Sequence, residues 1–218
     1  MGIVENCERI QQHIYNAAVR ANRDPQSVTL IAVTKTVPAD RVRQAAACGI
    51  RHVGENRLQD ALSKMDNLVD LKLDWHFIGH IQTNKAKKVA ELFNCVQSVD
   101  RIDLIEKLSP ATQKPLPVLI EVKLHDEPRK SGAAVSELPS LIEAIRAQAR
   151  LDLQGLMAVP PFFDNPEEVR PYFRQLCRLA RQFELKELSM GMTHDFEVAI
   201  EEGATLVRIG RGLFGERG

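Results

Sequence analysis

Eight short segments rich in apolar and β-branched residues recur along the 218 residues of the chain, and a segment of helical pattern follows nearly every one of them. Alternation of this kind is typical of βαβ units, whose strands lie parallel in one sheet. The predicted strands cover residues 28–35, 52–56, 74–79, 95–99, 117–124, 151–159, 187–190 and 205–210. The pattern therefore predicts an α/β protein with a parallel sheet.

The predicted helices between these strands cover residues 38–49, 58–69, 84–93, 102–108, 135–150, 166–184 and 194–202, and Gly49 is placed to end the first of them. A further amphipathic helix precedes the first strand, because Ile3, Cys7, Ile10 and Ile14 recur on one helical face. We see no internal domain boundary, so the chain is expected to form one domain over residues 1–218.

Two architectures accommodate this alternation. Eight units in a chain of 218 residues lie at the compact end of the range of (β/α)8 TIM barrels. A doubly wound open sheet is the alternative, but it normally has fewer strands and a glycine-rich turn after the first strand. Here the first strand runs into Thr34-Lys35-Thr36-Val37-Pro38, which contains no glycine. We therefore predict a TIM barrel with an extra N-terminal helix.

Composition excludes several classes of protein. Lys and Arg together number 29 and so do Asp and Glu, so no net charge favours a polyanion such as nucleic acid. No apolar run approaches the ~20 residues of a membrane span, and the N-terminus lacks the pattern of a signal peptide. The cysteines are scattered at Cys7, Cys48, Cys95 and Cys177, as in cytoplasmic proteins with reduced thiols. We expect a cytoplasmic protein without a nucleic-acid or membrane partner.

In a barrel, the active site lies at the carboxyl ends of the strands. Lys35 ends the first predicted strand and shares strand parity with Ile31 and Val33. Apolar surroundings lower the pKa of a lysine, and a neutral amine is what attack on a carbonyl requires. A lysine at this position can instead extend to solvent or pair with Glu55, so Lys35 alone does not define a site.

The loop after the seventh predicted strand, residues 189–195, is a second candidate site. Its glycine, Gly191, lets the backbone approach a ligand, and Ser189 and Thr193 supply hydroxyl groups. Barrels often bind phosphate in the loops after strands seven and eight, where Gly210 lies across from this segment. The alternative is an ordinary helix cap formed by Thr193 or Asp195.

Other polar residues carry weaker signals. Arg208 stands in an otherwise apolar strand; pointing inward it would face a ligand or a carboxylate, and pointing outward it would bridge to a helix. His76 and His80 share a strand face, but no third ligand is spaced for a metal, and no metal site is expected. Lys85, Lys87 and Lys88 indicate a solvated helix face, and the cysteines small buried side chains.

Several blocks in order resemble one known family, the pyridoxal phosphate (PLP) homeostasis proteins, nearly end to end. The blocks are Ala32-Val33-Thr34-Lys35-Thr36, Gly54-Glu55-Asn56, Trp75 to Gln82, Glu127 with Lys130-Ser131-Gly132, Ser189-Met190-Gly191-Met192, and Val207 to Gly210 through Phe214-Gly215-Glu216-Arg217. The resemblance implies a barrel similar to the barrel domain of alanine racemase, with PLP held as a Schiff base on Lys35.

The resemblance also implies roles for other residues. Ser189, Gly191, Thr193 and Gly210 fall in its phosphate-binding region, and Arg208 falls on the arginine that faces the pyridine nitrogen. Asn56 and Met157, at the ends of two further predicted strands, complete the expected cofactor-binding set. Thr193 stands where relatives often have serine. Lys123 stands where many have asparagine, and it is expected to pair with Glu121 or another acid.

The implied function is PLP binding in vitamin B6 and amino-acid homeostasis by a monomeric protein, with amino acids or PLP-dependent enzymes as candidate partners. No catalytic residue is expected, because a cation beside the pyridine nitrogen keeps it unprotonated and weakens the ring as an electron sink. The chain also ends soon after the eighth strand, so a second domain is not expected. The alternatives are a small PLP-dependent amino-acid racemase and, more distantly, a Schiff-base aldolase or isomerase acting on a phosphorylated sugar.

Overall fold

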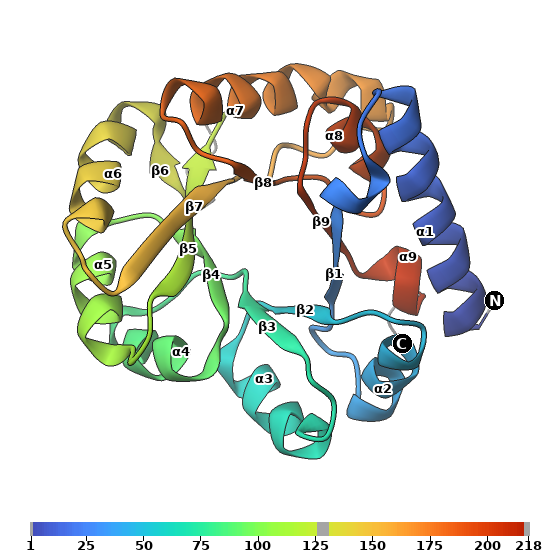
Figure 1. The fold of residues 1–218 in the computed structure, drawn as a ribbon, viewed down its shortest axis with the longest axis horizontal. Helices are drawn as coiled ribbons and strands as arrows, with labels where there is room; N and C mark the ends of the chain where they lie inside the picture. The colour runs from blue at the N-terminus through green and yellow to red at the C-terminus, as the bar shows by residue number, and fades with distance from the viewer. Residues whose placement is uncertain (1, 126–130, 216–218) are drawn as a thin grey trace.

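The fold is a closed parallel barrel, shown in a computed structural model that describes residues 2–125 and 131–215. Figure 1 views the ring of strands and helices end-on. Its strands are β1 (Thr29–Val33), β2 (His52–Glu55), β3 (Asp74–Phe77), β4 (Cys95–Val99), β5 (Leu116–Lys123), β7 (Leu151–Met157), β8 (Glu187–Ser189) and β9 (Leu206–Ile209). Each pairs in parallel with its neighbours, and pairing of β1 with β9 and of β4 with β5 closes the ring. The predicted TIM barrel is confirmed.

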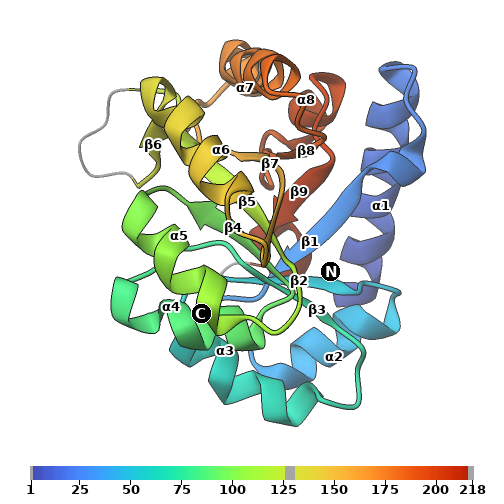
Figure 2. The same ribbon diagram turned by 60° about the vertical axis from the view of Figure 1, so that its left-hand side comes forward.

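Helices form a ring outside the strands (Figures 1 and 2). They are α1 (Ile3–Arg20), α2 (Ala39–Ala47), α3 (Leu58–Met65), α4 (Ala86–Leu92), α5 (Ile102–Leu108), α6 (Leu138–Arg146), α7 (Arg170–Gln182) and α8 (Phe196–Glu201). Short 3-10 turns add η1 (Pro25–Ser27), η2 (Asp66–Leu68), η3 (Thr83–Lys85), η4 (Ser109–Ala111), η5 (Val135–Glu137) and η6 (Pro166–Val169). The left-handed Gly49, with φ of 88°, ends α2 as predicted.

Two short elements are absent from the sequence-based assignment. The two-residue strand β6 (Ala133–Ala134) pairs with the end of β5, where the sequence indicates a loop. The single-turn helix α9 (Arg211–Phe214) follows β9 directly, where the sequence indicates only a tail. Neither element is long enough for a periodic pattern to be recognised.

The barrel separates two apolar layers. Ile31, Cys95, Leu119, Met157 and Leu206 pack against one another inside the barrel. The larger cluster lies between the outer face of the sheet and the helices, and it includes the buried face of α1. Alternate residues of a strand thus face the interior or the helices, which determines which polar side chains can meet inside the barrel.

The N-terminal helix α1 is tied to α9 at the other end of the described chain. The Asn6 side-chain amide donates to the Leu213 carbonyl at 3.0 Å, and the Arg9 guanidinium donates to the Gly212 carbonyl at 3.2 Å. From α2, Arg41 donates to the Phe214 carbonyl at 2.6 Å. These bonds use carbonyls that a helix end leaves without intrahelical partners, and they hold α9 against the barrel.

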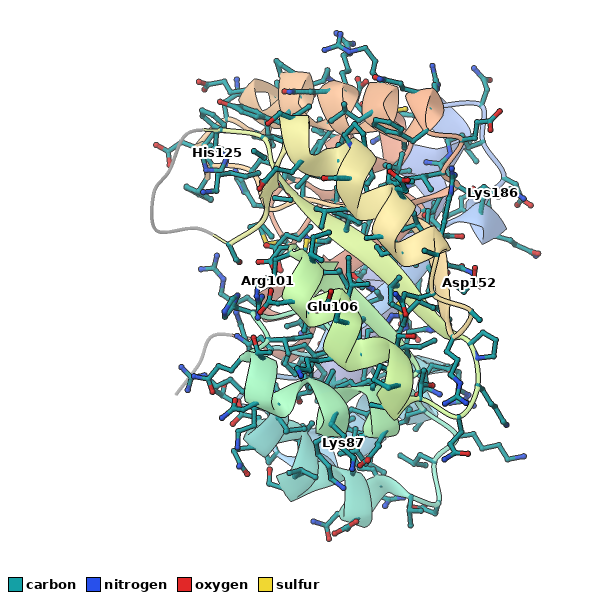
Figure 3. All side chains as sticks on the ribbon, turned by 90° about the vertical axis from the view of Figure 1, so that its left-hand side faces the viewer. Lys87, Arg101, Glu106, His125, Asp152 and Lys186 are labelled. Carbon is teal, nitrogen blue, oxygen red and sulfur yellow. The ribbon has the colours of Figure 1, made fainter. Side chains whose placement is uncertain are left out.

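The two ends of the barrel are distinct in the side view of Figure 3. Arg101 and His125, which follow β4 and β5, lie toward one end, and Asp152 and Lys186, at the starts of β7 and β8, lie toward the other. Among the described helices, none combines the length and apolar character that crossing a bilayer requires.

Candidate functional site

Lys35 lies in a half-buried turn immediately after β1, at the carboxyl end of the barrel, rather than in the strand itself. The preceding residue, Thr34, is buried; its hydroxyl donates to Glu55 Oε1 at 2.6 Å, and its carbonyl accepts from Lys64 Nζ at 2.6 Å. Lys64 also forms a buried ion pair with Glu55. Glu55 thus pairs with Lys64 on α3, and this cluster fixes the backbone that presents Lys35.

The loop after β8 contacts α9. Thr193 Oγ1 accepts a hydrogen bond from the Gly212 backbone N–H at 3.2 Å. Gly191 has φ of 89°, and a Cβ there would lie 2.5 Å from the Ala199 Cβ; a Cβ on Gly212 would lie 2.9 Å from Thr193 Cγ2. Gly210 lies beside the Val33 carbonyl. Of the predicted phosphate-region residues, Gly191, Thr193 and Gly210 lie in this loop and at the start of α9, whereas the Ser189 hydroxyl points into the barrel.

Arg208 points into the barrel and is 4% exposed. Its guanidinium donates to Ser189 Oγ at 2.5 Å and to the Ala158 carbonyl at 2.9 Å. Burial lowers the pKa of Arg208 to about 10, while Glu121 and Asp195 act in the opposite direction. The group therefore remains a cation at neutral pH, and the inward orientation considered from the sequence is the one observed.

Three other predicted residues take different positions around this centre. Ser189 is fully buried, and its hydroxyl donates to Gln97 Oε1 at 2.6 Å while accepting from Arg208, so both of its polar functions are engaged inside the barrel. Met157 is fully buried in the interior apolar cluster. Asn56 is half-buried at the end of β2. Its backbone lies so close to Gly79 that a Cβ on residue 79 would be 2.2 Å from the Asn56 carbonyl oxygen, so position 79 requires glycine.

Glu121 contributes a titratable carboxyl at this end of β5. It is 7% exposed and accepts a hydrogen bond from Ser131 Oγ at 3.2 Å. Burial, and to a lesser degree the nearby Asp100, raise the pKa of Glu121 to about 7, against the lowering effects of Ser131 and Arg208. Among the described residues, its side-chain hydrogen bond comes from Ser131, and no ion pair joins it to Lys123.

The two histidines, the lysines of η3 and α4 and the cysteines do not lie together in one site. Gln97 donates to His76 Nδ1 at 3.0 Å, and His76 Nε2 lies 3.1 Å from His52 Nδ1, whereas His80 is exposed and 3.8 Å from Asp100. Lys85, Lys87 and Lys88 are exposed on η3 and α4, as predicted. The cysteines are unpaired thiols; Cys7 and Cys95 are buried, and Cys48 and Cys177 are half-buried.

Sequence reasoning missed Gln97 and the site position of Glu121. Gln97 interrupts the strand Cys95-Val96-Gln97-Ser98-Val99 at the parity of Cys95, which faces the interior. Glu121 has the parity of Leu119 in β5. A polar residue at an inward position of a barrel strand is the signal that points to both.

The arrangement brings four chemical functions to one end of the barrel. An amine follows β1, a buried cation points inward from β9, and a carboxyl that titrates near neutral pH lies on β5. The hydroxyl and glycines of the loop after β8 and of α9 lie close enough for backbone N–H groups to approach an anion. This set can hold an anionic ligand that carries a group reactive toward amines.

We predict that Glu121→Gln changes the pH dependence of stability. The unfolded carboxyl releases its proton near 4.5 and the folded one near 7, so the native protein loses stability as pH rises through that window. Glutamine does not titrate, so the variant lacks this loss. The unfolding free energy of the variant minus that of the native protein should therefore increase by ~3 kcal/mol as the pH rises through this window, at about 1.4 kcal/mol per pKa unit. Urea unfolding at several pH values measures this.

The exposed Glu168→Gln is the matched control and should show no such trend. A difference between Glu121→Gln and the native protein that stays constant from acidic to alkaline pH contradicts the assignment of a raised pKa to Glu121.

Comparison with known proteins places this chain among relatives of the same fold. Residues 5–218 match the family described as alanine racemase, N-terminal domain. The Pseudomonas aeruginosa pyridoxal phosphate homeostasis protein is 47% identical over 99% of this chain and 96% of its own. The structure of Synechococcus elongatus PipY with PLP bound is 35% identical, with a TM-score of 0.82 over 98% of this chain and 100% of that one.

Alanine racemase from Corynebacterium glutamicum shares the fold alone, at 16% identity and a TM-score of 0.70 over 98% of this chain and 62% of the racemase. The family resemblance noted in the sequence is thus confirmed by relatives that match over nearly their full length. On the strength of these matches and of the barrel itself, the chain belongs to the pyridoxal phosphate homeostasis protein family.

Proposed function

We propose that this protein binds PLP at the carboxyl end of the barrel and takes part in intracellular PLP, vitamin B6 and amino-acid homeostasis. The observation that carries the proposal is that Lys35 follows β1 while the adjacent strand β9 carries the buried, inward-pointing Arg208. The PLP-bound PipY structure, similar over its whole length, supports the same ligand.

The described residues fit the chemical parts of PLP. Lys35 supplies an amine for the cofactor aldehyde. Thr193, with Gly191 and Gly210, supplies a hydroxyl and close backbone approach for the phosphate. Arg208 supplies a cation for the pyridine nitrogen, and Ser189 acts through Arg208, to which its oxygen is bonded. In this proposal Met157 forms the floor of the site and Asn56 its wall at the end of β2.

We further propose that the protein has no strong catalytic activity. Bound PLP supplies an electron-withdrawing ring that stabilises negative charge on a substrate carbon. Arg208 remains a cation at neutral pH, and a neighbouring cation disfavours protonation of the pyridine nitrogen, which weakens that function. Racemisation is the second candidate, and the observation in its favour is the Glu121 carboxyl, which titrates near neutral pH at the same end of the barrel.

The proposal extends to a monomer in the cytoplasm, where the four unpaired cysteines would stay reduced. Free amino acids and PLP-dependent enzymes are the proposed partners, because amino acids react with the PLP aldehyde and PLP-dependent enzymes take up PLP.

The first prediction concerns the covalent attachment of PLP. The protein incubated with PLP should absorb visible light, and borohydride reduction should fix the cofactor to the peptide that contains Lys35. Lys35→Ala should lose the attachment, whereas Lys123→Ala, at the neighbouring lysine after β5, should keep it. Peptide mass spectrometry measures both. Label found on Lys123 overturns the assignment, and a colourless protein would leave direct attack of Lys35 on a sugar substrate as the surviving alternative.

The second prediction concerns the phosphate. Thr193→Ala should weaken PLP binding about 10- to 100-fold, since a hydrogen bond to a charged group contributes about 1.5–3 kcal/mol. Binding of pyridoxal, which lacks the phosphate, should not change, and Thr193→Ser should retain the native affinity for PLP. Spectroscopic titration with both ligands separates these effects. Equal loss of affinity for PLP and pyridoxal means that Thr193 does not contact the phosphate.

The third prediction concerns turnover. Amino acids need only an accessible cofactor to exchange with Lys35, so L-alanine should change the visible spectrum of the loaded protein. It should not be converted to D-alanine at the ~1–10³ s⁻¹ typical of enzymes. Chiral chromatography after incubation measures this. Turnover in that range that disappears in Glu121→Gln would establish the racemase alternative in place of the binding role.

A further inference from the structure

Five polar side chains form a continuous line of hydrogen bonds through the inside of the barrel, which we call the interior chain: Arg208, Ser189, Gln97, His76 and His52. The successive donor–acceptor distances are 2.5 Å, 2.6 Å, 3.0 Å and 3.1 Å. The chain crosses from β9 to β8, over to β4, and on through β3 to β2. Barrel interiors are usually filled by branched apolar side chains, so a polar line of this length, buried up to the half-exposed His52, requires an explanation.

The interior chain runs in one direction in this structure. A guanidinium only donates hydrogen bonds, so Ser189 accepts from Arg208, and its hydroxyl donates to Gln97 Oε1. The Gln97 amide oxygen therefore faces Ser189, and its NH2 group donates to His76 Nδ1. Reversal at one of the later links alone would set two donors or two acceptors against each other.

The same logic fixes the tautomer of His76. Because Nδ1 accepts from Gln97, a neutral His76 carries its proton on Nε2 and donates it to His52 Nδ1. Burial, with a smaller contribution from His52, lowers the pKa of His76 to about 3, so His76 is neutral at physiological pH. A protonated His76 would present an N–H to the Gln97 NH2 group and break the line.

The interior chain and the Ala158 carbonyl hold the guanidinium from two sides. One nitrogen of Arg208 is tied to Ser189 on β8, and the other donates to Ala158, which follows β7. Two bonds to separate elements fix the plane of a fork-shaped group, whereas one bond leaves it free to swing. Loss of the Ser189 orientation would therefore release one side of Arg208.

We propose that Gln97 and His76 are positioning residues for Arg208, holding its guanidinium in the orientation that faces the pyridine nitrogen of PLP. This proposal rests on the proposed PLP-binding function. Neither residue need touch the cofactor: Gln97 acts on Arg208 through the hydroxyl of Ser189, and His76 acts through the amide of Gln97. The orientation of the cation at the cofactor site is thus determined by side chains inside the barrel that do not contact the cofactor.

The first arm of the test uses Gln97→Leu, with Cys95→Ala as the matched control. Cys95 lies on the same strand and faces the same interior, outside the interior chain. Both variants are loaded with PLP labelled with 15N at the ring nitrogen, and the 15N chemical shift is followed with pH. A loosened Arg208 disfavours protonation less, so in Gln97→Leu the ring-nitrogen pKa should rise by about one unit, a tenfold change in the protonation equilibrium. In Cys95→Ala it should equal the native value.

The second arm needs no cofactor. Long-range 1H–15N correlation spectra of the native protein should show His76 neutral and protonated on Nε2. If Gln97→Leu does not fold by circular dichroism, His76→Phe replaces it, because phenylalanine cannot accept from Gln97 and should produce the same rise in ring-nitrogen pKa.

The two arms separate the possible failures. A His76 protonated on Nδ1, or a ring-nitrogen pKa in Gln97→Leu or His76→Phe equal to the native one, overturns the positioning role while PLP still binds. A native protein that takes up no PLP overturns the proposed function instead, and the tautomer of His76 still decides whether the interior chain exists as described.

Discussion

A guanidinium buried inside a barrel must be hydrogen-bonded, because an unpaired charge taken out of water is far too costly to keep. Arg208 meets this requirement with Ser189 and the Ala158 carbonyl, while Glu121 and Asp195 stabilise its charge from a distance. Ser189 accepts from Arg208 and donates to Gln97, whose amide group is thereby directed toward His76. The buried cation is thus the first member of a line of polar side chains from β9, β8, β4, β3 and β2.

Polar residues between the sheet and the helices fix the position of Lys35. Glu55 and Thr34 face away from the barrel axis, and with Lys64 of α3 they lock the end of β1 from outside. The backbone that carries Lys35 and the guanidinium of Arg208 are therefore held by separate networks on opposite sides of the sheet. This separation allows the backbone at Lys35 and the guanidinium of Arg208 to be adjusted independently by substitution.

Much of this arrangement could be predicted from the sequence, and the rest could not for physical reasons. The alternating pattern is local, so the strands, the long helices and the strand-end position of Lys35 could be identified. The inward direction of Arg208 remained one of two alternatives, because it depends on partners in other strands. Gln97 has an inward strand position that could have pointed to it, but its partner could not be predicted, because the bond to Ser189 joins residues 92 positions apart across the barrel interior. β6 and α9 are too short to show a period.

Asn6 on α1 and Leu213 on α9 are 207 residues apart in sequence and joined by a hydrogen bond, so α1 reaches its final packing only after α9 has been made. During synthesis, the apolar face of α1 emerges well before α8 and α9, against which it packs in the folded barrel. Contacts between such distant segments slow folding, because the loop must be closed before they are formed. The nascent chain therefore carries an exposed apolar helix until those elements emerge, and a ribosome-associated chaperone would find a binding surface on α1.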